Sequence, residues 1–125
     1  RAEADTAAFC APMRSATAVW FGGGRQRYLA TAYVGTRFER ELYALLDRGG
    51  VVGGTSAGAA IQSRTMIAYG KSPPVLWVGL DLVPNAIVDQ HFVKRGRLPR
   101  MIHALEQRPG HFGVSIDEGT AVVIR

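Results

Sequence analysis

The segment Gly54-Thr-Ser-Ala-Gly58 is the feature that most limits how this chain can fold. It has the form G-x-S-x-G and follows the short apolar run Gly49–Gly53, where a buried strand should turn sharply into a helix. Such a turn lifts the Ser56 hydroxyl clear of the backbone and leaves the next N–H groups free to bind an oxyanion. Glycines suit the turn because they tolerate unusual backbone angles. The motif predicts a strand–turn–helix element with Ser56 as a candidate nucleophile.

Short apolar runs and helical periodicity alternate along the chain. We expect strands at residues 17–21, 51–52, 86–88, 113–116 and 121–124, the last two joined by a turn at 117–120. We expect helices at residues 5–14, 36–48 and 57–66, and another with Leu98, Met101, Ile102 and Leu105 on its apolar face. This alternation indicates an α/β fold with a mainly parallel sheet flanked by helices. Ligands of such sheets bind at the carboxyl ends of the strands, where Gln26, Ser56 and His91 fall.

Length and composition are those of one soluble globular domain. The chain has 125 residues, of which 47% are hydrophobic and 20% charged, so residues 1–125 are expected to form a single domain. No apolar run reaches the length of about 18 residues that a membrane span needs. No signal peptide is visible, which favours a cytoplasmic location, and the missing initiator Met suggests a processed product or a fragment. The single cysteine, Cys10, is expected to be a buried structural thiol.

Three histidines could supply the base that a serine nucleophile needs. His91 ends a predicted buried strand, 35 residues after Ser56, and this chain order agrees with elbow-type hydrolases. His103 falls in a predicted helix, one position off its apolar face, and His111 lies in a loop. We therefore expect structural or solvated roles for His103 and His111, and His91 is the candidate base.

The carboxylate that would orient this base is harder to find. Residues 57–80 contain no Asp or Glu, and Asp81 is the only carboxylate residue between the elbow and Asp89. Asp89 lies two residues before His91, so on an extended strand the two side chains point to the same face. Asp89 could orient the imidazole ring or cap the following helix. Asp81 and Asp89 both remain open as the acid.

Other kinds of site have little support in the sequence. The run Gly22–Gly24 lacks the third glycine of a dinucleotide-binding fingerprint, and no P-loop motif is present. Because H-E-x-x-H, cysteine pairs and dense carboxylate clusters are absent, we expect no metal and no cofactor. The net charge of +5 is densest at Lys94, Arg95, Arg97 and Arg100. These cations either lie in solvent at the start of a helix or face an anionic ligand. Nucleic acid is a less favoured ligand, because no aromatic residues alternate with the charges.

Four ordered blocks of sequence carry a family resemblance. They are FGGGRQ at residues 21–26, GGTSAGA at 53–59, DQHF at 89–92 with the arginines that follow, and GVSIDEGTA at 113–121. Together they are similar to the cyanophycinases, within the dipeptidase E-like serine peptidases of peptidase family S51. The resemblance implies a fold of the class I glutamine amidotransferase-like type, with this chain as its central and C-terminal portion. It also implies Ser56 as nucleophile, His91 as general base, and an oxyanion hole from the backbone N–H groups of Gly23 and Ala57.

A substrate is implied as well. Cyanophycinases cleave cyanophycin, a poly-aspartate backbone bearing arginine on its side chains, to β-Asp-Arg dipeptides. Six residues match the family's substrate pocket: Gln26, Asp89, Gln90, Arg95, Arg97 and Arg100. Arginine forks bind carboxylates bidentately, and Asp89 would suit a substrate guanidinium. We expect a serine-type peptidase that cleaves Asp-linked peptide or isopeptide bonds through an acyl-enzyme.

Departures from the family leave alternatives open. The family places its acid between the elbow and the D-Q-H block, where only Asp81 stands, and its members are longer than this chain. An aspartyl dipeptidase of the same family would keep the chemistry with another pocket. A catalytically silent protein that binds an anion or peptide would result if no acid serves His91. A homodimer is one way to cover exposed sheet edges, and no nucleic-acid or membrane partner is expected.

Overall fold

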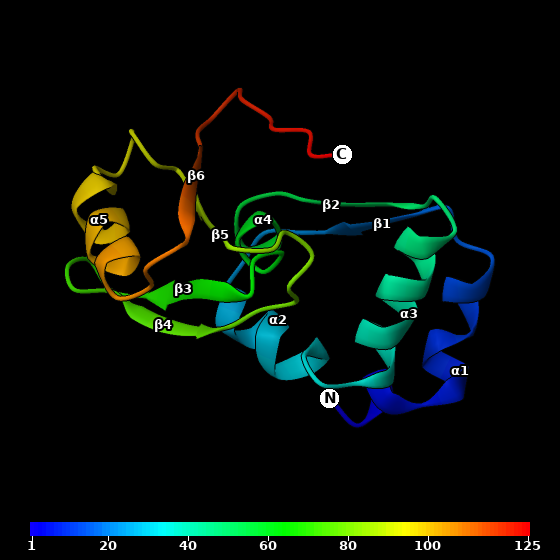
Figure 1. The fold of residues 1–125 in the computed structure, drawn as a ribbon. Coiled ribbons are helices and arrows are strands. Elements are labelled where there is room, and N and C mark those ends of the chain that lie inside the picture. The colour runs from blue at the N-terminus through cyan, green and yellow to red at the C-terminus, as the bar shows by residue number, and fades with distance from the viewer.

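The computed structural model of the protein describes residues 1–125 (Figure 1). Its helices are α1 (Ala7–Cys10), α2 (Gln26–Tyr33), α3 (Arg37–Asp47), α4 (Ala57–Ala60) and α5 (Leu98–Glu106), with short 3₁₀ helices at Glu3–Asp5 and Ala11–Arg14. Its strands are β1 (Ala18–Phe21), β2 (Val51–Gly54), β3 (Thr65–Tyr69), β4 (Val75–Val78), β5 (Ala86–Gln90) and β6 (Phe112–Ile116). None of the helices combines the length and the hydropathy that crossing a membrane requires.

The strands pair two by two. β1 and β2 run parallel, with Ala18 opposite Val51. β5 and β6 also run parallel, with Gln90 opposite Ile116, whereas β3 and β4 are antiparallel. Helix α4 contacts both β2 and β5 and so lies between the two parallel pairs (Figure 1). The expected α/β fold with mainly parallel strands is confirmed.

The main core lies between the β1–β2 pair and helices α1, α2 and α3, which gather on one side of these strands (Figure 1). Helix α3 is amphipathic as predicted, because Phe38, Leu42 and Leu45 are buried. Phe38 packs edge-on against Phe21 of β1, with ring centroids 6.2 Å apart. These contacts hold β1 in place, and its carboxyl end leads into the loop Gly22–Gly24.

Cys10 belongs to this core and is a buried free thiol, as predicted. Its Sγ lies 3.5 Å from the carbonyl oxygen of Ala4, to which it donates a weak hydrogen bond. Burial raises the pKa of the thiol, which disfavours the reactive thiolate. Cys10 is therefore a packing residue.

Several predicted elements are wrong. The helix predicted at 57–66 ends at Ala60, and residues 65–69 form β3, paired with the unpredicted strand β4. A short apolar run suits a buried helix as well as a strand, so the partner strand decides between them. Helix α2 was not expected, and residues 121–125 form no strand.

Helix α5 forms where it was predicted but buries only part of the predicted apolar face. Leu98 and Ile102 are 58% and 47% exposed, whereas Met101 and Ala104 are buried in a second, smaller core. The predicted apolar face is therefore right for Met101 and Leu105, which pack in or against this core, and wrong for Leu98 and Ile102. The helix also buries Arg100, which needs a charged partner inside the protein.

Candidate active site

Ser56 stands at the turn between β2 and α4, as the G-x-S-x-G motif predicts. Its φ of 52° lies in the left-handed region, which is uncommon for residues other than glycine and marks a strained turn. The two glycines of the motif are required by close packing. A Cβ at Gly54 would lie 2.2 Å from the Gly58 carbonyl oxygen, and a Cβ at Gly58 would lie 2.1 Å from that of Phe21. This packing holds Ser56 at a defined position beyond β2.

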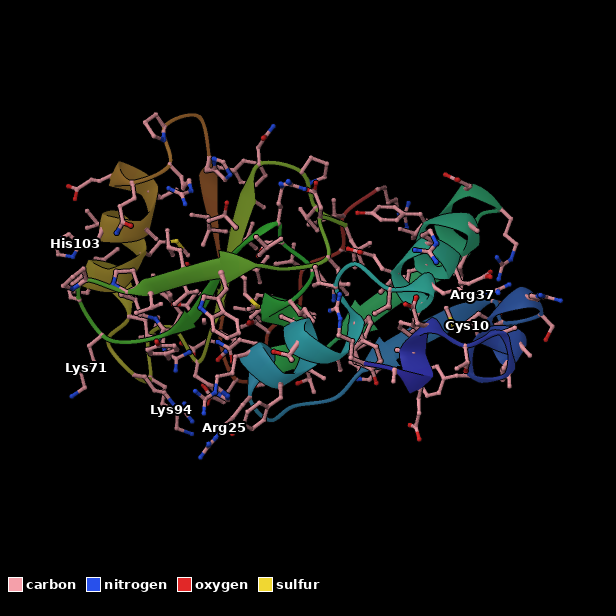
Figure 2. All side chains as sticks on the ribbon, turned by 90° about the horizontal axis from the view of Figure 1, so that it is seen from below. Cys10, Arg25, Arg37, Lys71, Lys94 and His103 are labelled. Atoms are coloured by element: carbon pink, nitrogen blue, oxygen red, sulfur yellow. The ribbon has the colours of Figure 1, made fainter.

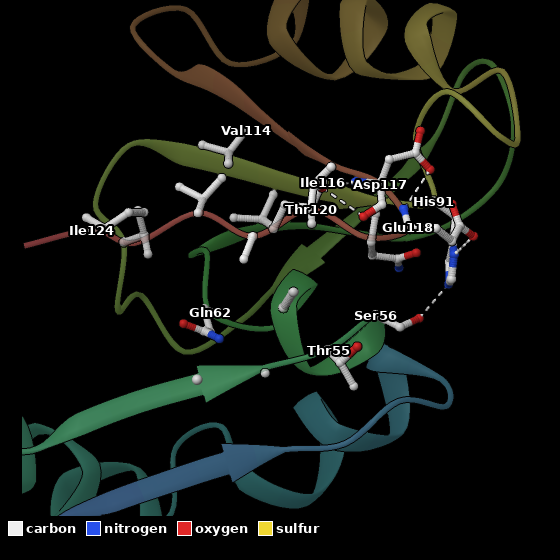
Figure 3. Close-up of a pocket in the computed structure, with 18 of the residues that line it drawn as sticks. Thr55, Ser56, Gln62, His91, Val114, Ile116, Asp117, Glu118, Thr120 and Ile124 are labelled. Atoms are coloured by element: carbon white, nitrogen blue, oxygen red, sulfur yellow. Dashed lines mark hydrogen bonds and ion pairs between the residues drawn. The ribbon is translucent and has the colours of Figure 1, made fainter.

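A chain of hydrogen bonds runs from Ser56 through His91 to Glu118 (Figure 3). Ser56 Oγ lies 3.0 Å from His91 Nε2, and His91 Nδ1 lies 2.7 Å from Glu118 Oε1. His91 directly follows β5, and Glu118 comes two residues after β6. Because β5 and β6 are parallel neighbours, their carboxyl ends bring the two residues together. The three side chains have the arrangement of a nucleophile, a base and an orienting acid.

Asp81 is not brought to His91, contrary to the expectation from the sequence. Asp81 Oδ2 lies 3.3 Å from Arg64 Nη1, and the Nδ1 atom of His91 is bonded to Glu118 instead. The sequence does not single out Glu118, because it lies 27 residues beyond His91 and outside the stretch between the elbow and the D-Q-H block. The signal that could have found it is strand pairing, because residues that follow two adjacent parallel strands become neighbours.

The other two histidines lie away from Ser56, in line with the structural roles expected for them. His111 Nε2 lies 3.1 Å from the hydroxyl of Thr65 at the start of β3. The Nδ1 atom of His103 is hydrogen-bonded to the hydroxyl of Ser72. No group of three or more His, Cys, Asp or Glu side chains is placed to hold a metal ion.

Asp117 ties the segment after His91 to the turn that carries Glu118. Its Oδ2 accepts hydrogen bonds from the backbone N–H of Val93 at 2.7 Å and of Lys94 at 3.3 Å. Its Oδ1 accepts from the N–H of Glu118 at 3.1 Å. One carboxylate therefore links the segments that carry His91 and Glu118, which nothing in the sequence indicates.

The Glu118 carboxyl is held in its ionised form. Hydrogen bonding with the side chains of Asp117 and then His91 lowers its pKa from 4.5 to about 2. Lys94 adds a positive charge, because its Nζ lies 3.3 Å from Glu118 Oε1. An ionised Glu118 can accept a hydrogen bond from the Nδ1–H of His91, which leaves Nε2 as the acceptor that faces Ser56.

We expect Glu118 to contribute to stability in a defined pH window. Because its folded-state pKa of about 2 is below the ordinary 4.5, ionised Glu118 stabilises the folded state fully above pH 4.5, and this contribution disappears as the pH falls towards 2. Urea unfolding of the wild type and of Glu118→Gln across this window checks the expectation. The difference in unfolding free energy should shrink with falling pH, and a difference that grows would contradict it.

The backbone around Ser56 supplies two N–H groups of the kind an oxyanion needs. Gly23 faces the elbow, since a Cβ built on it would lie 3.7 Å from Ser56 Cβ. Neither the N–H of Gly23 nor that of Ala57 donates to an acceptor within the chain. Ala57 is buried at the first position of α4, where unpaired N–H groups point towards the helix N-terminus. Both residues are those expected from the sequence for the oxyanion hole.

Three residues expected to bind substrate are instead bonded to one another. Asp89 is 1% exposed, and its carboxylate accepts two hydrogen bonds from the Arg100 guanidinium, one of them 2.7 Å from Nε. Arg97 Nη1 also lies 3.2 Å from Asp89 Oδ1. Such paired charges satisfy each other inside the protein. Asp89 is therefore occupied and faces neither His91 Nδ1 nor a free guanidinium.

The remaining three expected binding residues differ in their surroundings. Gln26 is buried, and its Nε2 donates to the carbonyl of Ile67 at 2.7 Å. Gln90 lines the cavity beside Ser56, while its Oε1 accepts from Arg97 at 2.7 Å. Arg95 is exposed, and its side chain forms no ion pair. Of the three expected arginines, only Arg95 carries a charge that no carboxylate pairs with.

We expect Asp89→Asn to destabilise the protein. Removing this carboxylate charge leaves Arg100 buried without a counter-ion, which should cost about 3–5 kcal/mol of the free energy of unfolding. Urea denaturation measures the loss, with the exposed Arg95→Gln as a matched control that changes stability by less than about 0.5 kcal/mol. An Asp89→Asn protein as stable as the wild type would show that the pair serves ligand binding alone.

A cavity of about 390 Å³ opens beside Ser56 (Figure 3). One wall is formed by the elbow with Thr55 and Ser56, and another by His91 and Glu118. Its apolar lining includes Val114, Ile116, Val122 and Ile124. Ser56, His91 and Glu118 thus lie at the edge of a space that can hold part of a ligand.

Comparison with known proteins settles the family. The model of Peptidase family S51 matches residues 2–125, which is almost the whole chain. The chain belongs to peptidase family S51. The resemblance inferred from the four sequence blocks is thereby confirmed.

Relatives of this S51 chain include cyanophycinases. It is 35% identical over 131 residues to the cyanophycinase of Synechococcus elongatus, covering 98% of this chain and 41% of that protein. It is 37% identical over 117 residues to the cyanophycinase of Geminocystis herdmanii, covering 87% of this chain and 43% of that protein. The crystal structure of a peptidase from an acI-B1 Actinobacterium matches with a TM-score of 0.75 and 26% identity, covering 94% of this chain and 50% of that one. The chain thus spans half or less of the length of these proteins.

Proposed function

We propose that this S51 chain is the catalytic portion of a serine peptidase of cyanophycinase type, which cleaves Asp-linked peptide or isopeptide bonds through an acyl-enzyme. The observation that carries the proposal is the hydrogen-bond chain Ser56–His91–Glu118, with separations of 3.0 Å and 2.7 Å. The alternative of a catalytically silent binding protein rested on the lack of an acid beside His91, and Glu118 occupies that position. The cyanophycinase relatives support the choice of substrate class.

In the proposed reaction, Ser56 Oγ attacks the substrate carbonyl carbon while His91 Nε2 accepts the hydroxyl proton. Glu118 accepts a hydrogen bond from the Nδ1–H of His91, which keeps the required tautomer and stabilises the imidazolium that forms. The N–H groups of Gly23 and Ala57 donate to the carbonyl oxygen as it becomes an oxyanion. His91 returns the proton to the leaving amine, which departs and leaves an ester on Ser56. Water, deprotonated by His91, then hydrolyses this ester.

Labelling and hydrolysis together test the proposal. A fluorophosphonate probe should modify Ser56, located by mass spectrometry, because only an activated serine reacts with it. Hydrolysis is then compared between a β-Asp-Arg polymer and Asp-X dipeptides, which separates a cyanophycinase from an aspartyl dipeptidase. Absence of both labelling and hydrolysis in folded protein would overturn the proposal.

We expect Asp117→Asn to lower kcat by about 10²-fold with little change in KM, because a small misplacement of reacting groups has an effect of this size. An asparagine amide nitrogen cannot accept hydrogen bonds from the N–H groups of Val93 and Lys94, so the link between base and acid loosens. Steady-state kinetics checks this, with Asp47→Asn at the end of α3 as the control. A change in KM alone would instead assign Asp117 to substrate binding.

We also propose that residues 1–125 form a single domain, that the protein is a homodimer and that it is cytoplasmic. Sedimentation of the purified protein would measure its oligomeric state. The exposed Trp20 on β1, 70% accessible, is one site at which a partner chain would bury apolar surface.

A further inference from the structure

Two arginines at the start of α2 converge on one tyrosine. Arg25 Nη1 lies 3.4 Å from the Tyr28 hydroxyl oxygen, and Arg27 Nη2 lies 3.1 Å from the same atom. The guanidinium carbons are 5.8 Å and 4.9 Å from the centre of the Tyr28 ring. Hydrogen bonds from Arg27 and Arg25 lower the pKa of this phenol. Both guanidinium groups therefore crowd around a single acceptor.

Neither arginine has a counter-ion. The ion pairs of the protein involve other cations, and none joins Arg25 or Arg27 to a carboxylate. Two like charges held close together repel each other, and an anion that enters between them relieves this repulsion. Arginine forks also match the geometry of a carboxylate better than that of a phenol. The cluster is thus arranged for an anionic group that Tyr28 satisfies only in part.

The cluster is attached to the catalytic elbow by a short, anchored segment. Gly23, which faces Ser56, comes two residues before Arg25. Gln26 lies between the two arginines and is buried, with its amide bonded to the Ile67 carbonyl at 2.7 Å. This bond fixes the start of α2 against β3, so the arginines have a defined place relative to Ser56.

A cavity lies at the same place. It has a volume of about 340 Å³ and is lined by Arg25, Gln26, Arg27, Ala68 and Tyr69. Figure 2 shows the Arg25 side chain reaching the surface with its nitrogen atoms outward. Of the three arginines that the sequence suggested for substrate binding, Arg97 and Arg100 are ion-paired with Asp89, and only Arg95 is unpaired. Arg25 and Arg27 are the unpaired cations that directly follow the Gly22–Gly24 loop.

We infer that Arg25 and Arg27 form a subsite for a carboxylate group of the peptide substrate, reached along the Gly22–Gly24 loop. The inference rests on the proposed function, because the ligand is taken to be the peptide that Ser56 attacks. The carboxylate is an acidic side chain or the free C-terminus of the peptide. On binding, both guanidinium groups turn from the Tyr28 hydroxyl to the carboxylate oxygens, and no covalent bond changes.

Binding to the inactive Ser56→Ala protein tests this subsite without any need for turnover. Isothermal titration calorimetry with tri-aspartate should show binding that weakens at least about tenfold in the added double variant Arg25→Gln/Arg27→Gln, since the variant loses hydrogen bonds between charged groups. The double variant Arg14→Gln/Arg108→Gln removes the same charge elsewhere and should change the affinity by less than about twofold. Tri-asparagine and the tri-aspartate C-terminal amide distinguish side-chain from terminal carboxylate recognition.

A second measurement on Ser56→Ala keeps the test independent of how the arginine variants fold. Tyrosine ring NMR, with the Tyr28 signal assigned through Tyr28→Phe, should show that signal shift when tri-aspartate is added, because the phenol loses its two donors. Tri-aspartate that leaves the Tyr28 signal unchanged, or whose affinity is the same in the Arg25→Gln/Arg27→Gln protein, overturns the subsite. Failure of the proposed function appears separately, as wild-type protein that does not react with the fluorophosphonate.

Discussion

Ser56→Ala is expected to lower kcat by about 10⁴-fold or more, because it removes the nucleophile on which the acyl-enzyme depends. The loss should fall on kcat, with substrate binding kept, since the cavity and the elbow backbone are unchanged. His91→Ala should cause a loss of similar size. Nucleophile and base act as a unit, so combining the two variants should add little to either one.

Steady-state kinetics and fluorophosphonate labelling test this expectation. Steady-state kinetics on the best peptide substrate compares wild type, Ser56→Ala, His91→Ala and the double variant. Ser15→Ala, at an exposed serine far along the chain from the elbow, is the control and should behave as wild type. Loss of fluorophosphonate labelling in Ser56→Ala, together with retained labelling in Ser15→Ala, would assign the reactive hydroxyl. A wild-type kcat for Ser56→Ala would exclude the proposed mechanism.

Glu118→Gln should produce the second large effect, a fall in kcat of about 10⁴-fold as in other serine hydrolases that lose the charge of the orienting acid. The amide has the same size as the carboxylate but no charge. Its nitrogen can donate to Nδ1 of His91, which would favour the tautomer with a proton on Nε2. That tautomer cannot accept the Ser56 proton.

Asp81→Asn is the matched comparison, because Asp81 is the only carboxylate residue in the stretch where the family resemblance places the acid. Its carboxylate is paired with Arg64 at 3.3 Å, so neutralising it should change kcat by no more than about twofold. Proton NMR of the His91 ring adds a readout that a loss of packing would not produce. The Nδ1 proton resonance should move in Glu118→Gln and stay in place in Asp81→Asn. A larger kinetic effect from Asp81 than from Glu118 would contradict the assignment of the acid.

Features set by local geometry were predictable from the sequence. A Cβ at Gly54 or Gly58 would collide with backbone, and the spacing of these glycines in the sequence indicates such a tight turn. The periodicity of Phe38, Leu42 and Leu45 predicts the buried face of α3 in the same way. The position of His91 at a strand end was also inferred correctly, because the strand is a short apolar run.

Features set by distant pairing were not predictable. The sequence of β3 suits a helix as well as a strand, and its pairing with β4 decides for the strand. Asp89 was expected to bind substrate, but in the structure it is ion-paired with Arg100. Both outcomes depend on residues that approach only when the chain is compact. Neither the spacing of residues nor the composition predicts which distant residues will come into contact.

The sequence by itself determined that Ser56 sits on an elbow and that His91 is the histidine placed to serve it. Only the tertiary structure decided that Glu118 is the carboxylate hydrogen-bonded to His91. The physical reason is strand register: the parallel pairing of β5 and β6 places Gln90 opposite Ile116, and so brings together two residues that lie 27 positions apart in the chain.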